Sequence, residues 1–188
     1  MHHREQNERY RKTPISGPPE PWLHLTTLHA GSVHAVGFTE SEEYLLVISV
    51  SGRGLFELPS GARVARDYDE DGDWWDVSHL RAKALAPVAD EWVRVAGIHG
   101  GGLLYVTDDG WSLELVAPDW PSSVVFLYPP QVGVSRTGFN LGPDRDESIR
   151  VYGFSASGRY FVIATGSEVL LFGRGPVARR ALSPSAPG

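Results

Sequence analysis

The chain contains no cysteine, and this absence excludes several kinds of chemistry. Without thiols there is no disulfide framework, no thiolate nucleophile and no cysteine-ligated metal. A cysteine-free chain fits a reducing compartment, so we expect a cytoplasmic location. No apolar run approaches the roughly 20 residues that a transmembrane helix requires. Residues 1–12 are polar and charged, so we expect no secretory signal peptide.

Positive charge is also scarce. Lysine and arginine number 17 against 23 aspartates and glutamates, which gives a formal net charge of −6. Since phosphate groups are bound mainly by lysine and arginine, this balance argues against a nucleic-acid partner or an anionic membrane surface. The chain carries no complete nucleotide-binding or hydrolase motif, so we expect neither catalytic machinery nor an organic cofactor. All but two of the basic residues are arginines, which hints at a GC-rich bacterial genome.

What the sequence does contain is an internal repeat. A shift of 116 positions aligns residues 33–58 with residues 149–174, and the matched pairs include Gly37/Gly153, Phe38/Phe154, Ser41/Ser157 and Tyr44/Tyr160. A shift of 58 aligns residues 45–49 with residues 103–107. These matches predict three units of about 58 residues that start near positions 33, 91 and 149, each burying apolar surface on its neighbours.

The repeated pattern is Gly-Phe-x-x-Ser-x-x-Tyr followed by an apolar run, and it resembles a blade of WD-repeat-like β-propellers. The resemblance covers residues 33–58 and 149–174 and implies an all-β, antiparallel, propeller-like repeat domain. Two features depart from the family: no Gly-His or Trp-Asp signature ends the units, and the period exceeds the roughly 40–45 residues of WD repeats. A β-trefoil and an irregular β-barrel with threefold similarity remain alternative folds.

The composition along the chain predicts one domain with two tails. Residues 1–21 are polar and then rich in proline, and are predicted to form a disordered or extended arm. Residues 22–174 are predicted to form the single β-repeat domain, and residues 175–188 a flexible tail. Residues 22–28 have the composition of a strand. This strand could complete the short last unit, as first-to-last strand pairing does in propellers, and so remove an exposed sheet edge.

The sharpest local signal is an acidic stretch, residues 67–76, which we name the acidic–aromatic segment. It holds six carboxylates and no basic residue. Exposed tryptophans within an acidic rim suit docking onto a basic protein surface. The candidate partner-binding residues are therefore Asp67, Asp69, Glu70, Asp71, Asp73, Trp74, Trp75 and Asp76.

The first half of this segment also matches a calcium loop. Asp67, Asp69 and Asp71 alternate, and Gly72 permits a sharp turn, so these three aspartates are candidate calcium ligands. The match to an EF-hand fails at its twelfth position, where Ser78 replaces the bidentate glutamate, and no flanking helices are predicted. A solvated acidic hairpin that binds nothing is the third interpretation.

Together these features favour a non-catalytic module that binds another protein through loops at one end of a rigid β scaffold. Within that class we favour a bacterial immunity-type or inhibitor protein, because a compact acidic domain with an acidic–aromatic segment suits masking a basic active site. The alternative is a calcium-dependent or carbohydrate-binding β module that uses the same segment.

Overall fold

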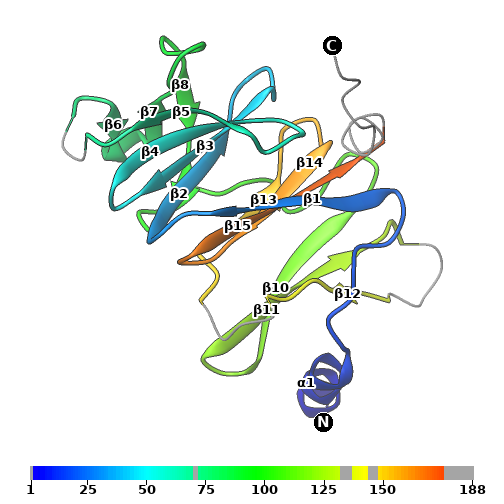
Figure 1. Cartoon of the computed structure of the whole chain (residues 1–188). Helices are drawn as coiled ribbons and strands as arrows, with labels where there is room; N and C mark the ends of the chain where they lie inside the picture. The colour runs from blue at the N-terminus through cyan, green and yellow to red at the C-terminus, as the bar shows by residue number, and fades with distance from the viewer. Residues whose placement is uncertain (1, 70–71, 132–136, 144–147, 176–188) are drawn as a thin grey trace.

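The computed structural model describes residues 2–69, 72–131, 137–143 and 148–175. In these residues fifteen strands form four antiparallel sheets, none of which closes into a barrel, and one α-helix precedes them (Figure 1). The predicted all-β class is therefore confirmed. No helix within these ranges has the length and the apolar character that a membrane span requires.

Sheet C is built around the apolar run Leu45–Ile48. In spatial order it contains β5 (Arg63–Asp67), β4 (Gly52–Glu57), β3 (Tyr44–Ser49), β2 (Val33–Phe38) and β9 (Ala96–Gly97). The run does not alternate with polar residues, because β3 is a central strand whose side chains are buried on both faces. The turn into β4 requires Gly52, which has a φ of 95° and lies where a Cβ would be 2.2 Å from the Asp67 carbonyl oxygen.

Sheet B combines the two ends of the domain. Its spatial order is β1 (Trp22–His29), β15 (Glu168–Arg174), β14 (Tyr160–Ala164) and β13 (Val151–Phe154). β1 pairs antiparallel with β15 from Trp22 opposite Arg174 to His29 opposite Glu168, with one irregularity between His24 and Thr26. The strand expected at residues 22–28 thus covers the outer edge of β15, as the sequence indicates.

Sheet A contains β10 (Ser112–Asp119), β11 (Ser122–Tyr128) and β12 (Phe139–Asn140). Residues 103–107, which the shift of 58 aligns with β3, do not form a comparable central strand. Within them Leu104 and Val106 make only isolated bridges, to Phe154 and Ser112 respectively. The structure does not support that alignment, because an apolar run marks a strand without showing which strand of a unit it is.

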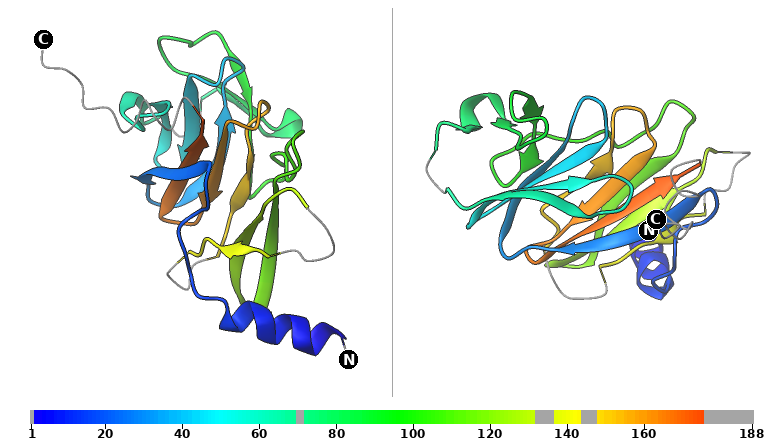
Figure 2. Two further views of the ribbon diagram at one scale, coloured as in Figure 1. Left: turned by 90° about the vertical axis from the view of Figure 1, so that its right-hand side faces the viewer. Right: turned by 45° about the horizontal axis from the view of Figure 1, so that its top comes forward.

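Sheet D is an insertion between β5 and β9. It contains β6 (Trp75–Asp76), β7 (Arg81–Lys83) and β8 (Trp92–Arg94), and the 3-10 helix η1 (Val77–His79) joins the first two strands. This small sheet lies at one end of the molecule, far from α1 (His2–Lys12), in all the views of Figures 1 and 2.

The N-terminal residues differ from the disordered or extended arm that their composition predicts. Residues 2–12 form α1, whose first turn holds Glu5 and whose last turn is basic, an arrangement that favours the helix dipole. Arg11 anchors the helix to sheet A, with its Nε 2.7 Å from Asp119 Oδ1 and its Nη2 2.6 Å from the Pro118 carbonyl oxygen. Apart from Gly175, the predicted flexible tail at residues 175–188 lies outside the described residues.

The core is shared between neighbouring sheets. Trp22, at the start of β1, is 0% exposed, and its ring lies between residues of sheets A and B. The ring centroids of Trp111, Phe154 and Phe161 are 6.0, 5.5 and 4.9 Å from that of Trp22. A second cluster joins the apolar faces of sheets B and C. The buried indole of β1 therefore packs against β13 and β14 of its own sheet and also against sheet A.

We expect Trp22→Ala to lower the free energy of unfolding by about 3–5 kcal/mol, because it removes a fully buried aromatic side chain and leaves a cavity. Trp120→Ala is the matched control, since Trp120 is 87% exposed and its removal should cost less than about 0.5 kcal/mol. Urea denaturation of both variants measures the difference. Equal losses for the two tryptophans would contradict the role assigned to Trp22.

Candidate functional site

A cleft of about 470 Å³ opens where sheets B, C and D meet, a volume within the range of roughly 300–1,000 Å³ that is usual for binding sites. Its walls come from four segments that are far apart in the sequence: residues 38–42, 91–94, 102–104 and 154–156. The apolar part of the lining is supplied mainly by Phe38, Trp92, Leu103, Leu104 and Phe154. We name this feature the acidic cleft because of the glutamates in its lining.

Carboxylates outnumber cations around this cleft. Glu40, Glu42 and Glu91 line it, whereas Arg94 is the one cationic residue among its described lining residues. The Glu40 backbone N–H donates a hydrogen bond to Glu91 Oε1 at 2.6 Å, which holds the turn after β2 against the start of β8. The lining therefore combines apolar side chains with carboxylates that attract positive charge.

Three turns near the cleft share one hydrogen-bond pattern. They span residues 39–44, 107–111 and 155–160, and each begins with a threonine or serine. The backbone N–H of that first residue donates to the carbonyl oxygen of the last residue at 3.0, 2.8 and 3.0 Å. Its hydroxyl accepts from the N–H of the last residue at 3.1, 3.0 and 3.3 Å. Each hydroxyl thus satisfies a backbone donor that the turn would otherwise leave unpaired.

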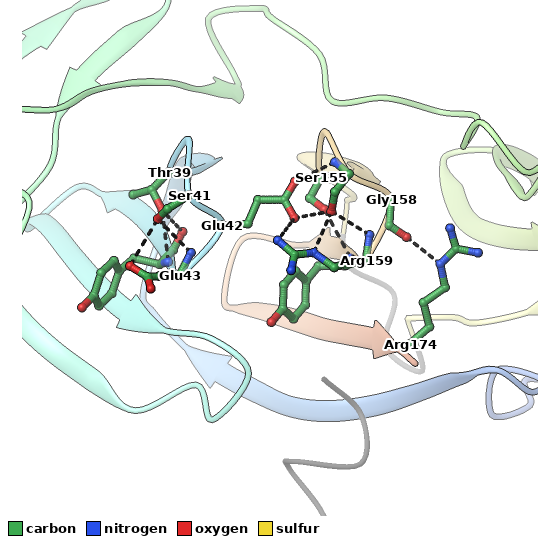
Figure 3. A network of polar contacts seen from close by, with 11 residues as sticks. Thr39, Ser41, Glu42, Glu43, Ser155, Gly158, Arg159 and Arg174 are labelled. Atoms are coloured by element: carbon green, nitrogen blue, oxygen red, sulfur yellow. Dashed lines mark hydrogen bonds and ion pairs between the residues drawn. The ribbon is translucent and has the colours of Figure 1, made fainter. Parts of the chain in front are cut away.

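Glu42 joins the first of these turns to the third (Figure 3). Its side chain is only 4% exposed, and its backbone has a φ of 55°. The Ser157 N–H donates to Glu42 Oε1 at 2.7 Å, and the Ser157 hydroxyl donates to Glu42 Oε2. Arg159 Nη2 lies 3.4 Å from the same Oε2. The buried carboxylate is thereby paired and hydrogen-bonded, as burial of a charge requires.

Arg174 joins the third turn to the second. Its Nε donates to the Gly158 carbonyl oxygen at 2.7 Å (Figure 3), and its Nη2 donates to Asp109 Oδ1 at 2.9 Å. The hydrogen bonds from Arg174 and from Thr107 lower the pKa of Asp109 to about 2. The three turns therefore form one connected polar network along this side of the molecule.

The carboxylates at the ends of the acidic–aromatic segment are occupied within the protein. Asp67 accepts the Asp69 N–H at 3.0 Å and faces Arg53, whose Nη2 lies 3.0 Å from Asp67 Oδ2. These contacts lower the pKa of Asp67, and the hydrogen bond from the Asp69 N–H lowers it more than Arg53 does. The arginine guanidinium lies against the carboxylate group that a calcium ion would use, so Asp67 has a structural role here.

Asp76, at the other end, is held in the same manner. It accepts hydrogen bonds from the Ser78 hydroxyl at 2.7 Å and from the His79 N–H at 3.2 Å, and Arg81 Nη2 lies 3.1 Å from its Oδ2. These hydrogen bonds, led by that of Ser78, hold the pKa of Asp76 well below its usual range. Asp76 thereby caps the short helix η1.

The two tryptophans of the segment differ from the exposed pair that docking would require. Trp74 is 5% exposed and packs in the core of sheets C and D, with the Arg53 guanidinium 4.6 Å from its ring centroid. The expected exposure is therefore wrong for Trp74, because a cation–π contact and neighbouring apolar side chains cover its ring. Trp75 is half-buried, stacks on Trp74 and has the His99 ring at 5.2 Å.

Of the other predicted residues, Asp69 and Asp73 are exposed, whereas Glu70 and Asp71 lie outside the described residues. Among the residues that the structure does describe, no group of three or more His, Asp or Glu side chains is arranged to hold a metal ion. In the described part of the segment, Asp69 and Asp73 are thus exposed and Trp75 is half-buried.

No protein-family model matches the chain, and comparison with the curated proteins and with the solved structures found no significant match. Function is therefore inferred from the chemistry of the sites themselves.

Sequence reasoning did not find the acidic cleft. One signal was present, since the turn after β2 holds three glutamates within residues 40–43 of a repeated pattern. No such signal marks Glu91, Trp92 or Arg94, because they reach the cleft only through the folding of sheet D.

We expect Glu42→Ala to lower the free energy of unfolding by about 2–3 kcal/mol, because it leaves the Ser157 donors without their charged acceptor. Glu43→Ala, at the exposed neighbouring position, should change it by less than about 0.5 kcal/mol. Chemical denaturation measures both. If the two variants lose the same stability, the carboxylate of Glu42 does not join the two turns.

Asp109 makes stability depend on pH in a defined window. Its folded pKa lies below its unfolded value, so its contribution is complete above about pH 4 and is lost as the pH falls toward 2. Because its side chain is 54% exposed, we expect the free energy of unfolding of wild type to exceed that of Asp109→Asn by less than about 1 kcal/mol at neutral pH. Chemical denaturation of both proteins at several pH values between about 4 and 2 should show this difference in unfolding free energy shrinking as the pH falls. A gap that stays constant would contradict the ion pair with Arg174.

Proposed function

We propose that this chain is a non-catalytic protein-binding module that masks a basic surface of a partner protein, as immunity-type and inhibitor proteins do. The observation that carries this proposal is the acidic cleft, in which three glutamates and one arginine surround an apolar interior. Such a cleft fits a protruding basic side chain better than a small anionic ligand, because like charges repel.

The chemistry of an arginine or lysine side chain matches both parts of the cleft. Its alkyl stem can lie on the apolar side chains of Phe38 and Leu103 while its charged head meets Glu40 and Glu91 of the same lining. Glu42 lines the same cleft, but its carboxylate already accepts a hydrogen bond from Ser157 and lies beside Arg159. Its contribution is therefore negative potential, and it does not supply a free acceptor for the partner's side chain. Leu104, which also lines the cleft, is 50% exposed and adds apolar surface to this contact.

The acidic–aromatic segment supplies a second contact area in this proposal. It leads into β6 of sheet D, whereas the acidic cleft is bordered by β8 of the same sheet. Exposed Asp69 and Asp73 add negative charge, and half-buried Trp75 adds aromatic surface. Together with the formal net charge of −6, these residues favour approach of a basic partner and a fast association rate.

The scaffold in this proposal is a propeller-like array of repeated units in a cytoplasmic protein. In support, the turns at residues 39–44 and 155–160, which the shift of 116 aligns, have the same hydrogen bonds, and each leads into a strand of a different sheet. Pairing of β1 with β15 completes the C-terminal sheet, which is how propellers join their ends. Turns that gather on one side of such a scaffold are a usual place for binding residues.

The test uses the double variant Glu40→Gln/Glu91→Gln, which removes two charges from the cleft and keeps an acceptor oxygen for the Glu40 N–H. Wild type, used as bait in its native host, should retain a stoichiometric partner with a basic surface. The variant should bind that partner at least roughly tenfold more weakly, because charge pairs across an interface are lost. Quantitative mass spectrometry followed by titration of the purified pair measures this difference.

The matched control is Glu43→Gln/Glu57→Gln, which makes the same change of charge at two exposed positions away from the lining of the cleft. It should retain the partner. Equal retention by both double variants would refute the cleft as the binding site, and the absence of any stoichiometric partner would refute the proposed function.

A further inference from the structure

The last strand of the domain, β15, ends beside the acidic cleft. Arg174, its final residue, donates from Nε to the Gly158 carbonyl oxygen at 2.7 Å (Figure 3). The Arg174 backbone N–H donates to the Arg159 carbonyl oxygen at 3.0 Å. Gly158 and Arg159 belong to the turn at residues 155–160, whose first two residues line the cleft. The end of β15 is therefore fixed to one wall of the cleft.

The chain that follows this strand is basic. We name residues 176–188 the basic tail, which contains Arg179 and Arg180 but no aspartate or glutamate. These are the only two arginines that are adjacent in the sequence, and the pair lies between Val177 and Leu182. The basic tail thus combines two positive charges with apolar neighbours.

The acidic cleft offers groups that complement both features. Among the described residues, no lysine or arginine forms an ion pair with Glu40 or Glu91, although both glutamates line the cleft. Leu104 of the lining is 50% exposed, and Val106, two residues further along the chain, is 59% exposed. Carboxylates without a cation and uncovered apolar side chains together match a segment that is both basic and apolar.

The basic tail is long enough to reach these groups. Arg179 and Arg180 are four and five residues beyond Gly175, which corresponds to roughly 13–18 Å of fully extended chain. A short tether gives an effective local concentration on the order of millimolar. Charge pairs that are weak between separate molecules are therefore sufficient to hold the tail.

We infer that the basic tail occupies the acidic cleft of its own chain when no partner is bound. An arginine of the pair Arg179 and Arg180 places its charged head at Glu40 and Glu91, with its alkyl stem on the apolar lining. The apolar neighbours of the pair lie on exposed Leu104. The tail is in this way an internal competitor for the site.

This inference rests on the proposed function in one respect, the preference of the acidic cleft for basic side chains, and it adds a means of regulation. A partner must displace the basic tail before it can bind. Its apparent affinity is therefore reduced by the fraction of molecules in which the cleft is occupied. Only a partner whose basic side chains fit the cleft better than the tail binds well.

The experiment measures distances between two spin labels on the purified full chain by pulsed electron paramagnetic resonance. Because the chain has no cysteine, Ala89→Cys and Ser183→Cys provide the only labelling sites, and neither substitution changes the formal charge. Ala89 is exposed, lies two residues before Glu91 and is outside the described lining of the cleft. The distances should include a narrow population of short values, because the tail is held at the cleft.

Three changes should lower that population at least about threefold, because each removes or replaces the charge pairs. They are Arg179→Gln/Arg180→Gln, Glu40→Gln/Glu91→Gln, and an excess of hexa-arginine peptide at constant ionic strength. Two matched controls, Arg179→Lys/Arg180→Lys and Glu43→Gln/Glu57→Gln, should keep the population, because the first preserves the charges of the tail and the second changes exposed glutamates outside the cleft lining.

A broad distribution in the doubly labelled wild type would overturn the inference, as would a narrow population that any of the three changes leaves intact. Dilution with excess unlabelled protein should not alter the population. Its loss on dilution would show that the tail comes from a second copy, which also overturns the inference. No partner protein is used, so failure here leaves the search for a partner in the native host as a separate test of the proposed function.

Discussion

The Glu42 carboxylate, which lies almost out of contact with water between two hairpin turns, is the polar contact that joins sheets B and C beside the apolar cluster they share. A buried carboxylate needs donors, and the N–H and hydroxyl of Ser157, together with Arg159, provide them from the other sheet. These donors sit in a turn whose own backbone is hydrogen-bonded, so the carboxylate ties the two turns to each other at a defined place.

The acidic cleft follows from that constraint. Phe38 and Phe154 occupy the last positions of β2 and β13, directly before the turns that Glu42 joins, so the same contact sets the distance between two of the cleft walls. Arg174 extends the network to Asp109 and thus to the turn that leads into sheet A. A rigid polar network on one side of the molecule and the buried Trp22 in the shared core together give a scaffold on which exposed carboxylates can be positioned.

The sequence predicts the strands better than the site, for physical reasons. Long apolar runs such as Leu45–Ile48 identify strands by themselves, and the composition of residues 22–28 predicts a strand. Its pairing with the last strands was expected because the last repeat unit is short, and the structure has that pairing. The contents of the cleft depend on sheet D, whose strands of two or three residues carry no periodic signal.

The acidic–aromatic segment shows the same limit in another form. A tryptophan beside aspartates is predicted to be exposed. In the structure Arg53, which is distant in the sequence, covers Trp74 and also binds Asp67. The helix at residues 2–12 is a similar case, because its contacts with Asp119 and Tyr128 lie more than a hundred residues away. Contacts between residues that are far apart in the sequence produce no local sequence pattern, so they could not be predicted from the sequence.

The most direct test of the central claim is site-specific photocrosslinking in the native host. A photoreactive side chain placed at exposed Ala156, on the lining of the acidic cleft, should form one dominant adduct with an arginine- or lysine-rich segment of a single partner protein. The same group at exposed Val64, on the outer strand of sheet C, should not. Adducts of equal yield and identity from both positions, or none from Ala156, would contradict the account.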